Sequence, residues 1–228
     1  MTILALDPMD LAALLCSRVC HDVISPVGAI VNGLEVLEDE TDPSMREVAM
    51  ELIKKSANSA SAKLQFCRLA FGAAGSVGAT IDTGDAESVA RGLLATEKTT
   101  LAWSGARQFL AKNKVKLLLN LCLIAAATIP RGGMLGVEFS GAGDAITLHV
   151  TAKGPNPRLA TGVVDLVAGR PENGRVDAHT IQPYFAGLVA RECGMVVEVE
   201  TLADGFAFVA KPAATVAELP AAETVASA

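Results

Sequence analysis

The 228-residue sequence predicts an α+β chain in which an antiparallel helical hairpin precedes an α/β sandwich. Near the N-terminus, two long stretches repeat apolar residues at helical spacing on either side of a short turn. Beyond a segment rich in glycine, alanine and serine, short runs alternate apolar and polar residues between glycine-containing turns. The expected domains are therefore the hairpin at residues 1–75, the sandwich at residues 80–212, and a tail at residues 213–228. We expect this tail to be disordered, because alanine, proline, glutamate and threonine dominate it.

The first helix is expected from about Pro8 to Glu38, because its apolar residues fall on one arc at about 100° per residue. His21 lies roughly opposite that arc, within a strip of polar and small side chains. The apolar arc consists of Leu15, Val19, Val23, Val27, Ile30, Leu34 and Leu37.

A turn at Asp39–Pro43 connects the first helix to a second one that ends at the glycine cluster 72–78. Either Asp42 or Ser44 is expected to cap this second helix, and Ser44 and Glu47 are spaced as a capping box. A hairpin of two amphipathic helices cannot bury both apolar faces alone. We therefore expect two copies to pair as a dimeric four-helix bundle, with His21 on the outside of each protomer.

The sandwich is predicted from three helical stretches and several short strands, some of which form hairpins at glycine turns. The helices are expected near Asp85–Ala95, Asn113–Ile129 and Thr180–Cys193, a strand near Thr100–Ser104, one hairpin at Leu135–Ser140 and Ala145–Thr151, and another at Val196–Leu202 and Phe206–Lys211.

Composition limits the possible functions and the cellular location. The net charge of −6, without a basic run, disfavours nucleic-acid binding, so proteins are the expected partners. Five cysteines without a CxxC pair are typical of reduced thiols in the cytoplasm. Residues 1–15 lack the basic start of a signal peptide, and the apolar run Val115–Ile129 is too short to span a membrane, so we expect a soluble cytoplasmic protein.

His21 is the first candidate for chemistry. It is followed by Asp22 and then by Ser25 and Pro26, within the same helix. Pro26 lacks the N–H that would bond the Asp22 carbonyl, so a kink is expected just after His21. A lone histidine on a helix is more often a solvated or capping residue. A metal site of Cys16, Cys20 and His21 is disfavoured, because no second cluster of ligands exists.

The run from His21 to Ile30 resembles the phosphoacceptor motif of sensor histidine kinases, His-[Glu/Asp]-x-x-[Ser/Thr]-Pro-[Leu/Val]-x-x-Ile. Six residues match in order: His21, Asp22, Ser25, Pro26, Val27 and Ile30. The resemblance implies that His21 carries a phosphoryl group.

The second half is similar to the ATP-binding domain of these kinases, with residues 117–121 and 130–133 resembling the asparagine-bearing helix and its following turn. The nucleotide site departs from the pattern at three places. Ile124 stands where the kinases hold Mg²⁺ with an asparagine, and Ala152 stands at the aspartate that reads adenine. Side chains at residues 180–182 crowd the expected phosphate loop. We therefore expect a degenerate ATPase-like domain that binds no nucleotide.

Together these features resemble the ChpT-type histidine phosphotransferases of alphaproteobacteria, over nearly the whole chain except the tail. The resemblance implies a phosphorelay enzyme that transfers phosphoryl groups reversibly between the receiver of a hybrid kinase and response regulators, including a cell-cycle transcription factor. It implies no cofactor in this chain, because Mg²⁺ comes with the partner receiver. One alternative is a non-catalytic, kinase-like dimer that binds and regulates a kinase or receiver, and another, disfavoured by Ile124 and Ala152, is an ATP-dependent kinase.

Roles follow for the residues around His21. We expect neutral His21 to attack the acyl phosphate, and Asp22 to orient its ring and offset the charge that develops there. Arg18 is equally compatible with a phosphoryl or receiver contact and with a surface charge. His149 and His179 are interpreted as structural. The expected docking residues for the receiver are Leu14, Arg18, Ser25, Gly28, Asn32 and Glu35.

Overall fold

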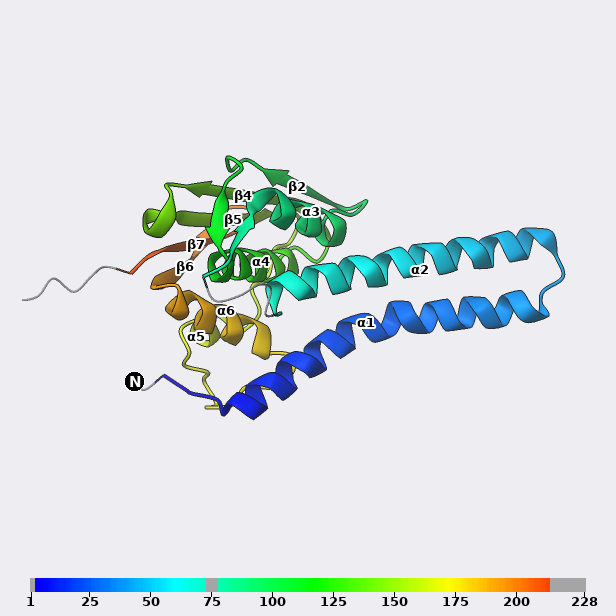
Figure 1. Ribbon diagram of the computed structural model, residues 1–228, viewed down its shortest axis with the longest axis horizontal. Coiled ribbons are helices and arrows are strands. Elements are labelled where there is room, and N and C mark those ends of the chain that lie inside the picture. Colours follow the sequence, from blue (N-terminus) through cyan, green and yellow to red (C-terminus); the bar gives the residue numbers. More distant parts are fainter. Residues whose placement is uncertain (1–2, 73–77, 214–228) are drawn as a thin grey trace, which may run out of the picture.

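The computed structural model describes residues 3–72 and 78–213. Two long antiparallel helices, α1 (Pro8–Asp39) and α2 (Pro43–Ala70), extend from one side of an α/β unit (Figure 1). The expected α+β class, with a helical hairpin before an α/β sheet domain, is confirmed. Residues 214–228 of the predicted tail and residues 73–77 of the predicted linker lie outside the described residues.

Aspartate side chains cap both long helices. The Asp7 carboxylate accepts a hydrogen bond from the backbone N–H of Met9, and Asp42 accepts bonds from the N–H groups of Ser44 and Met45. The predicted alternative of a Ser44 cap, with a Ser44 and Glu47 capping box, is wrong because Ser44 already lies inside α2. The Ser44 hydroxyl also bonds the Asp42 carboxylate and, with the two backbone bonds, lowers the pKa of that group.

A five-stranded sheet with strand order β2-β4-β5-β7-β6 forms the layer opposite the helices. β2 pairs with β4 in parallel, and all other neighbours are antiparallel. The two hairpins predicted from the sequence are β4 with β5 and β6 with β7. The bounds are β2 Thr99–Trp103, β4 Gly133–Ser140, β5 Thr147–Lys153, β6 Met195–Leu202 and β7 Gly205–Pro212.

Three helices cover one face of this sheet (Figure 1). They are α3 (Thr83–Leu94), α4 (Lys112–Ala127) and α6 (Ile181–Glu192), each within about three residues of its predicted bounds. α4 lies at the centre of the core, so leucines on several of its sides are fully buried, among them Leu117, Leu118, Leu119 and Leu121. Burial of this helix on nearly every side explains why its sequence from Leu117 onward is apolar apart from Asn120.

The sequence did not predict four short elements. β1 (Thr80–Asp82) and β3 (Phe109–Ala111) form a two-stranded antiparallel sheet, and η1 (Gly143–Ala145) and α5 (Val163–Val167) are single short turns of helix. Elements of three to five residues are too short to display a hydrophobic period, so neither helix nor strand spacing marks them.

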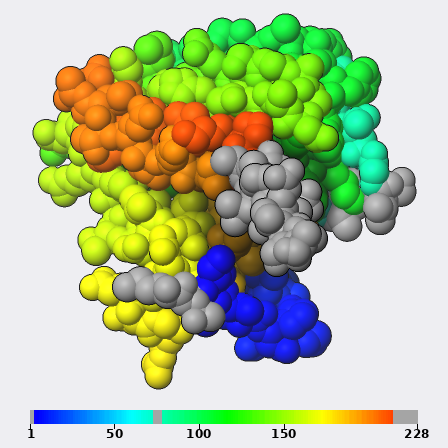
Figure 2. Space-filling view, turned by 90° about the vertical axis from the view of Figure 1, so that its left-hand side faces the viewer, coloured from blue at the N-terminus to red at the C-terminus, as the bar shows by residue number. Residues whose placement is uncertain are grey.

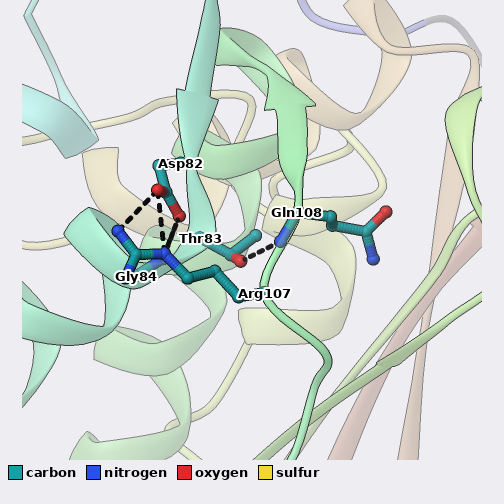
Figure 3. Close-up of polar contacts among 5 residues, drawn as sticks. All are labelled: Asp82, Thr83, Gly84, Arg107 and Gln108. Carbon is teal, nitrogen blue, oxygen red and sulfur yellow. Dashed lines mark hydrogen bonds and ion pairs between the residues drawn. The ribbon is translucent and has the colours of Figure 1, made fainter.

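The junction of β1 with α3 is fixed by a polar cluster (Figure 3). The Asp82 carboxylate accepts a hydrogen bond from the N–H of Gly84 and two-pronged bonds from the Arg107 guanidinium, at 2.7–2.9 Å. The Thr83 hydroxyl accepts from the N–H of Gln108 at 2.9 Å. These bonds attach the start of α3 to the segment that leads into β3.

Phe66, Leu69 and Ala70 at the end of α2 pack into the main hydrophobic core, and hydrogen bonds attach both ends of the hairpin to the α/β unit. The buried Asn120 side chain of α4 donates to the carbonyl of Ala70 at 2.9 Å, which holds the end of α2. The N-terminal segment lies beside the chain around residues 165–175 (Figure 2), where the N–H of Leu4 donates to the Gly169 carbonyl. The Tyr184 hydroxyl of α6 donates to the Leu4 carbonyl at 2.8 Å. The base of α1 is therefore held against α6.

Candidate functional site

His21 lies on α1 with 74 % of its side chain exposed. The helix continues through this residue without interruption, from the Asp7 cap to Asp39. Because an exposed imidazole on a rigid helix needs no opening motion to meet a partner, its position suits chemistry between two proteins.

Asp22 lies between His21 and Arg18. Its carboxylate accepts a hydrogen bond from the Arg18 guanidinium at 2.9 Å, one helical turn away. The other carboxylate oxygen is 3.7 Å from Nδ1 of His21, which is longer than a hydrogen bond but close enough for electrostatic attraction. Nδ1 is therefore the ring nitrogen that faces a negative charge, and Nε2 is the nitrogen left for a reaction.

Pro26 shapes the backbone directly after His21. Figure 1 shows α1 changing direction between its two halves, in agreement with the kink predicted from this proline. Pro26 has no N–H for the Asp22 carbonyl, and the Lys63 ammonium of α2 donates to that carbonyl instead, at 2.7 Å. Lys63 was not singled out from the sequence, because its partner is a carbonyl oxygen on another helix.

His179 lies beside His21, although the two are far apart in the sequence. Their ring centroids are 6.3 Å apart and the ring planes are inclined by 78°. His179 belongs to the turn that leads into α6, and this turn is brought to α1 by the packing of the two helices. The sequence contains no local signal for this pairing, and the interpretation of His179 as structural did not anticipate it.

The predicted docking residues differ in their surroundings. Ser25, Asn32 and Glu35 are exposed, and a Cβ added at Gly28 would meet no atom within 4 Å. Leu14 instead packs against the buried cluster of Leu166, Ile181 and Tyr184. The strip that follows His21 along α1 is therefore open. Leu14 and Arg18 precede His21 on α1 and contact other residues of the chain, since Leu14 packs against that buried cluster and Arg18 bonds Asp22.

Gly33 contrasts with Gly28 on the same helix. It is buried against α2, and a Cβ there would lie 2.6 Å from Cγ1 of Ile53. A side chain at position 33 would press on the neighbouring helix, whereas one at position 28 would project into open space. The two glycines thus have different roles, and only Gly28 faces outward.

Residues at the three departures from the kinase pattern are packed inside the α/β unit, except for the half-buried Thr180. Ile124 is 5 % exposed and Ala152 is fully buried, and both belong to the main hydrophobic core. The buried Gln182 side chain donates to the backbone carbonyl of Asn120 at 3.3 Å. Apolar side chains offer neither oxygen ligands for a hard cation nor an acceptor for adenine. Within residues 3–72 and 78–213, three or more His, Cys, Asp and Glu side chains nowhere gather as a metal site would require.

Comparisons with known proteins identify close relatives of this chain. A family model described as the histidine phosphotransferase C-terminal domain matches residues 83–205. The chain is 50 % identical over 206 residues to the protein phosphotransferase ChpT of Brucella abortus (strain 2308), which covers 90 % of this chain and 97 % of that one. A solved structure described as a bacterial phosphotransferase matches with a TM-score of 0.84 and 47 % identity, covering 92 % of this chain and all of the other.

Proposed function

Because the chain belongs to the histidine phosphotransferase family, we propose that His21 is the residue through which it carries phosphoryl groups. The chain is a phosphotransferase of two-component phosphorelays, and its partners are proteins of that signalling class. The observation that supports His21 is its exposed imidazole, with one nitrogen facing Asp22 at 3.7 Å. A non-catalytic binding protein would require neither the imidazole nor its carboxylate neighbour.

The proposed transfer begins with a neutral His21 and a phosphorylated aspartate on a partner receiver domain. The Nε2 lone pair forms the N–P bond, and the P–O bond breaks with its electrons going to the leaving carboxylate. Nδ1 keeps its proton throughout, so the phosphorylated ring is positively charged, and the Asp22 carboxylate stabilises that charge. Because a phosphoramidate and an acyl phosphate are both high-energy species, the same step runs in reverse toward a response regulator.

We propose that this chain needs no nucleotide or metal of its own. Ile124 and Ala152 fill core positions where a kinase would hold Mg²⁺ and adenine. Mg²⁺ is supplied by the receiver, whose aspartates hold it, and neutralises charge on the phosphoryl group during transfer. His21, Asp22 and the open strip that follows them provide the nucleophile, its electrostatic partner and the approach for the receiver.

We further propose that the chain acts as a homodimer through its helical hairpin. Large apolar side chains on both helices are exposed in the single chain, although such residues are normally covered in a helical bundle. Pairing two hairpins would cover them and leave the polar strip at His21 outside. The exposed apolar residues are Ile24, Val27, Val31 and Leu34 on α1 and Met45, Val48 and Leu52 on α2.

A cytoplasmic location fits this assembly. α1 is long and apolar enough, by length and composition alone, to cross a membrane. Its apolar residues are equally those of a bundle helix, and the Arg18 and Asp22 pair in its first half would be costly within lipid.

The proposed receiver partners include a hybrid kinase and response regulators, among them one that controls the cell cycle.

The test is a transfer assay with a labelled, phosphorylated receiver domain. We expect label to move to the wild-type chain, to be acid-labile and alkali-stable, and to be absent from His21→Ala. No transfer to the wild type from a competent receiver that binds tightly would instead support the non-catalytic alternative, in which the dimer regulates a kinase or receiver without carrying phosphate.

A further inference from the structure

His179 presents an exposed imidazole to the proposed phosphoacceptor. Its ring centroid is 6.3 Å from that of His21, in an edge-to-face arrangement. Among the residues that the structure describes, the His179 ring has no hydrogen-bond partner, and its side chain is not part of the core. A structural role for this side chain therefore has little support.

The position of His179 is fixed by the turn that carries it. Asp177 Oδ1 accepts hydrogen bonds from the N–H groups of His179 and Thr180 at 2.9 Å, and from the Thr180 hydroxyl at 2.7 Å. The next residues enter α6, where Ile181 and Tyr184 are fully buried. The backbone at position 179 is thus held between a closed turn and the core, while its side chain extends toward α1.

Two cationic side chains lie near the two imidazoles, and each already gives one hydrogen bond within the chain while keeping further N–H groups. The Arg18 guanidinium is bonded to Asp22, and the Lys63 ammonium is bonded to the Asp22 carbonyl. The charged groups that the recorded contacts place around the two imidazoles include Arg18 and Asp22 on α1, Lys63 on α2, and Asp177, which interacts electrostatically with His179 in the same turn. His179 adds an exposed imidazole beside His21, and its ring donates no hydrogen bond to the residues that the structure describes.

We propose that His179 is a second catalytic residue of the transfer, and that its protonated ring donates a hydrogen bond to a non-bridging oxygen of the phosphoryl group. This inference rests on the proposed role of His21. As the N–P bond forms at His21 and the P–O bond to the receiver aspartate breaks, His179 keeps its proton and only stabilises the negative oxygens. Nucleophile and donor thus come from two distant parts of the chain, α1 and the turn before α6.

The experiment compares rapid transfer from a labelled phospho-receiver to the wild type, His179→Ala, His179→Gln, His149→Ala and His21→Ala. His149 is the matched control, because it lies in β5, half-exposed beside Glu138, on the sheet. We expect His179→Ala to slow transfer about tenfold, a modest loss for one donor at a solvent-exposed site. His149→Ala should retain the wild-type rate, and His179→Gln, which keeps a neutral donor, should recover part of the loss.

The pH profile separates donation from a structural role. The advantage of the wild type over His179→Ala should shrink as the pH is raised, because only a protonated ring can donate to the phosphoryl group as a cation. A wild-type rate in His179→Ala, a loss that is constant with pH, or an equal loss in His149→Ala would overturn the role of His179. Loss of transfer in His21→Ala alone would leave the proposed function intact, whereas transfer that persists in His21→Ala would overturn the proposed function itself.

Discussion

Replacing Lys63 by methionine tests how the chain tolerates a proline in α1, one turn after His21. Methionine keeps the length and helix propensity of lysine but cannot donate to the Asp22 carbonyl, which Lys63 bonds at 2.7 Å. Hydrogen bonds to charged groups contribute about 1.5–3 kcal/mol, and the partial exposure of this site lets water replace some of that. We expect Lys63→Met to lower the free energy of unfolding by about 1 kcal/mol.

Pro26→Ala supplies the second arm of a double-mutant cycle. Alanine restores the N–H that bonds the Asp22 carbonyl inside the helix, and it removes a residue that costs about 3 kcal/mol in a helix interior. Loss of the buried ring offsets about 1 kcal/mol of this gain, so Pro26→Ala should be stabilising. With the carbonyl already satisfied, Lys63→Met should then cost less than about 0.5 kcal/mol.

Urea unfolding at one fixed protein concentration measures the four free energies, because pairing of protomers would make stability depend on concentration. A cost of about 1 kcal/mol corresponds to a midpoint shift of about 0.5 M for a slope of about 2 kcal/mol per molar urea. If Lys63→Met has the same cost beside Pro26 as beside an alanine, Lys63 does not replace the missing N–H and this reasoning is refuted.

Three further predictions concern the docking strip, acid stability and the core. Gly28→Leu should slow transfer about tenfold, because the new side chain would project from α1 into the space that the receiver needs. It should also raise the free energy of unfolding by about 0.5–1 kcal/mol, because leucine favours a helix more than glycine does. Gly33→Ala should instead destabilise the hairpin, because its Cβ would press on Ile53 of α2. An unchanged transfer rate for Gly28→Leu would count against the docking strip. Hydrogen bonds from Arg107 hold the pKa of Asp82 below its usual range. This pair therefore stabilises the fold at pH values above the usual pKa of an aspartate, and the contribution is lost as the pH falls through the lowered pKa. Arg107→Gln should therefore flatten the acid decline in melting temperature, and a profile that keeps its wild-type slope would contradict this. Burial raises the pKa of the Cys122 thiol to about 12. A thiol reagent at neutral pH should therefore modify the exposed Cys16 and Cys20 of α1 and leave Cys122 unmodified. Early labelling of Cys122, detected by mass spectrometry, would refute this.

The long elements are local features, which is why the sequence predicted them, and the motif of the proposed phosphoacceptor is local as well. α1 and α2 repeat their apolar residues over many turns, α4 contains a long apolar run, and the motif around His21 lies within ten residues. The kink could be predicted for the same reason, because it depends on a single proline.

Contacts between distant segments could not be predicted in this way. Lys63 meets a carbonyl of α1, and His179 meets His21, only because α2 and α6 pack beside α1.

Ser44 illustrates a different difficulty. Asp42 and Ser44 are both good caps by residue type, and Pro43 at the first position of α2 is compatible with the cap at Asp42.

The most direct test of a relay through His21 isolates the phosphorylated chain and follows the phosphoryl group in both directions. After incubation with a labelled phospho-receiver, peptide mapping under alkaline conditions should locate the label on His21. The purified phosphorylated chain should then pass it to a fresh, unphosphorylated receiver in the presence of Mg²⁺ and without nucleotide. Label on another residue, or label on His21 that no receiver can remove, would contradict a relay through this histidine.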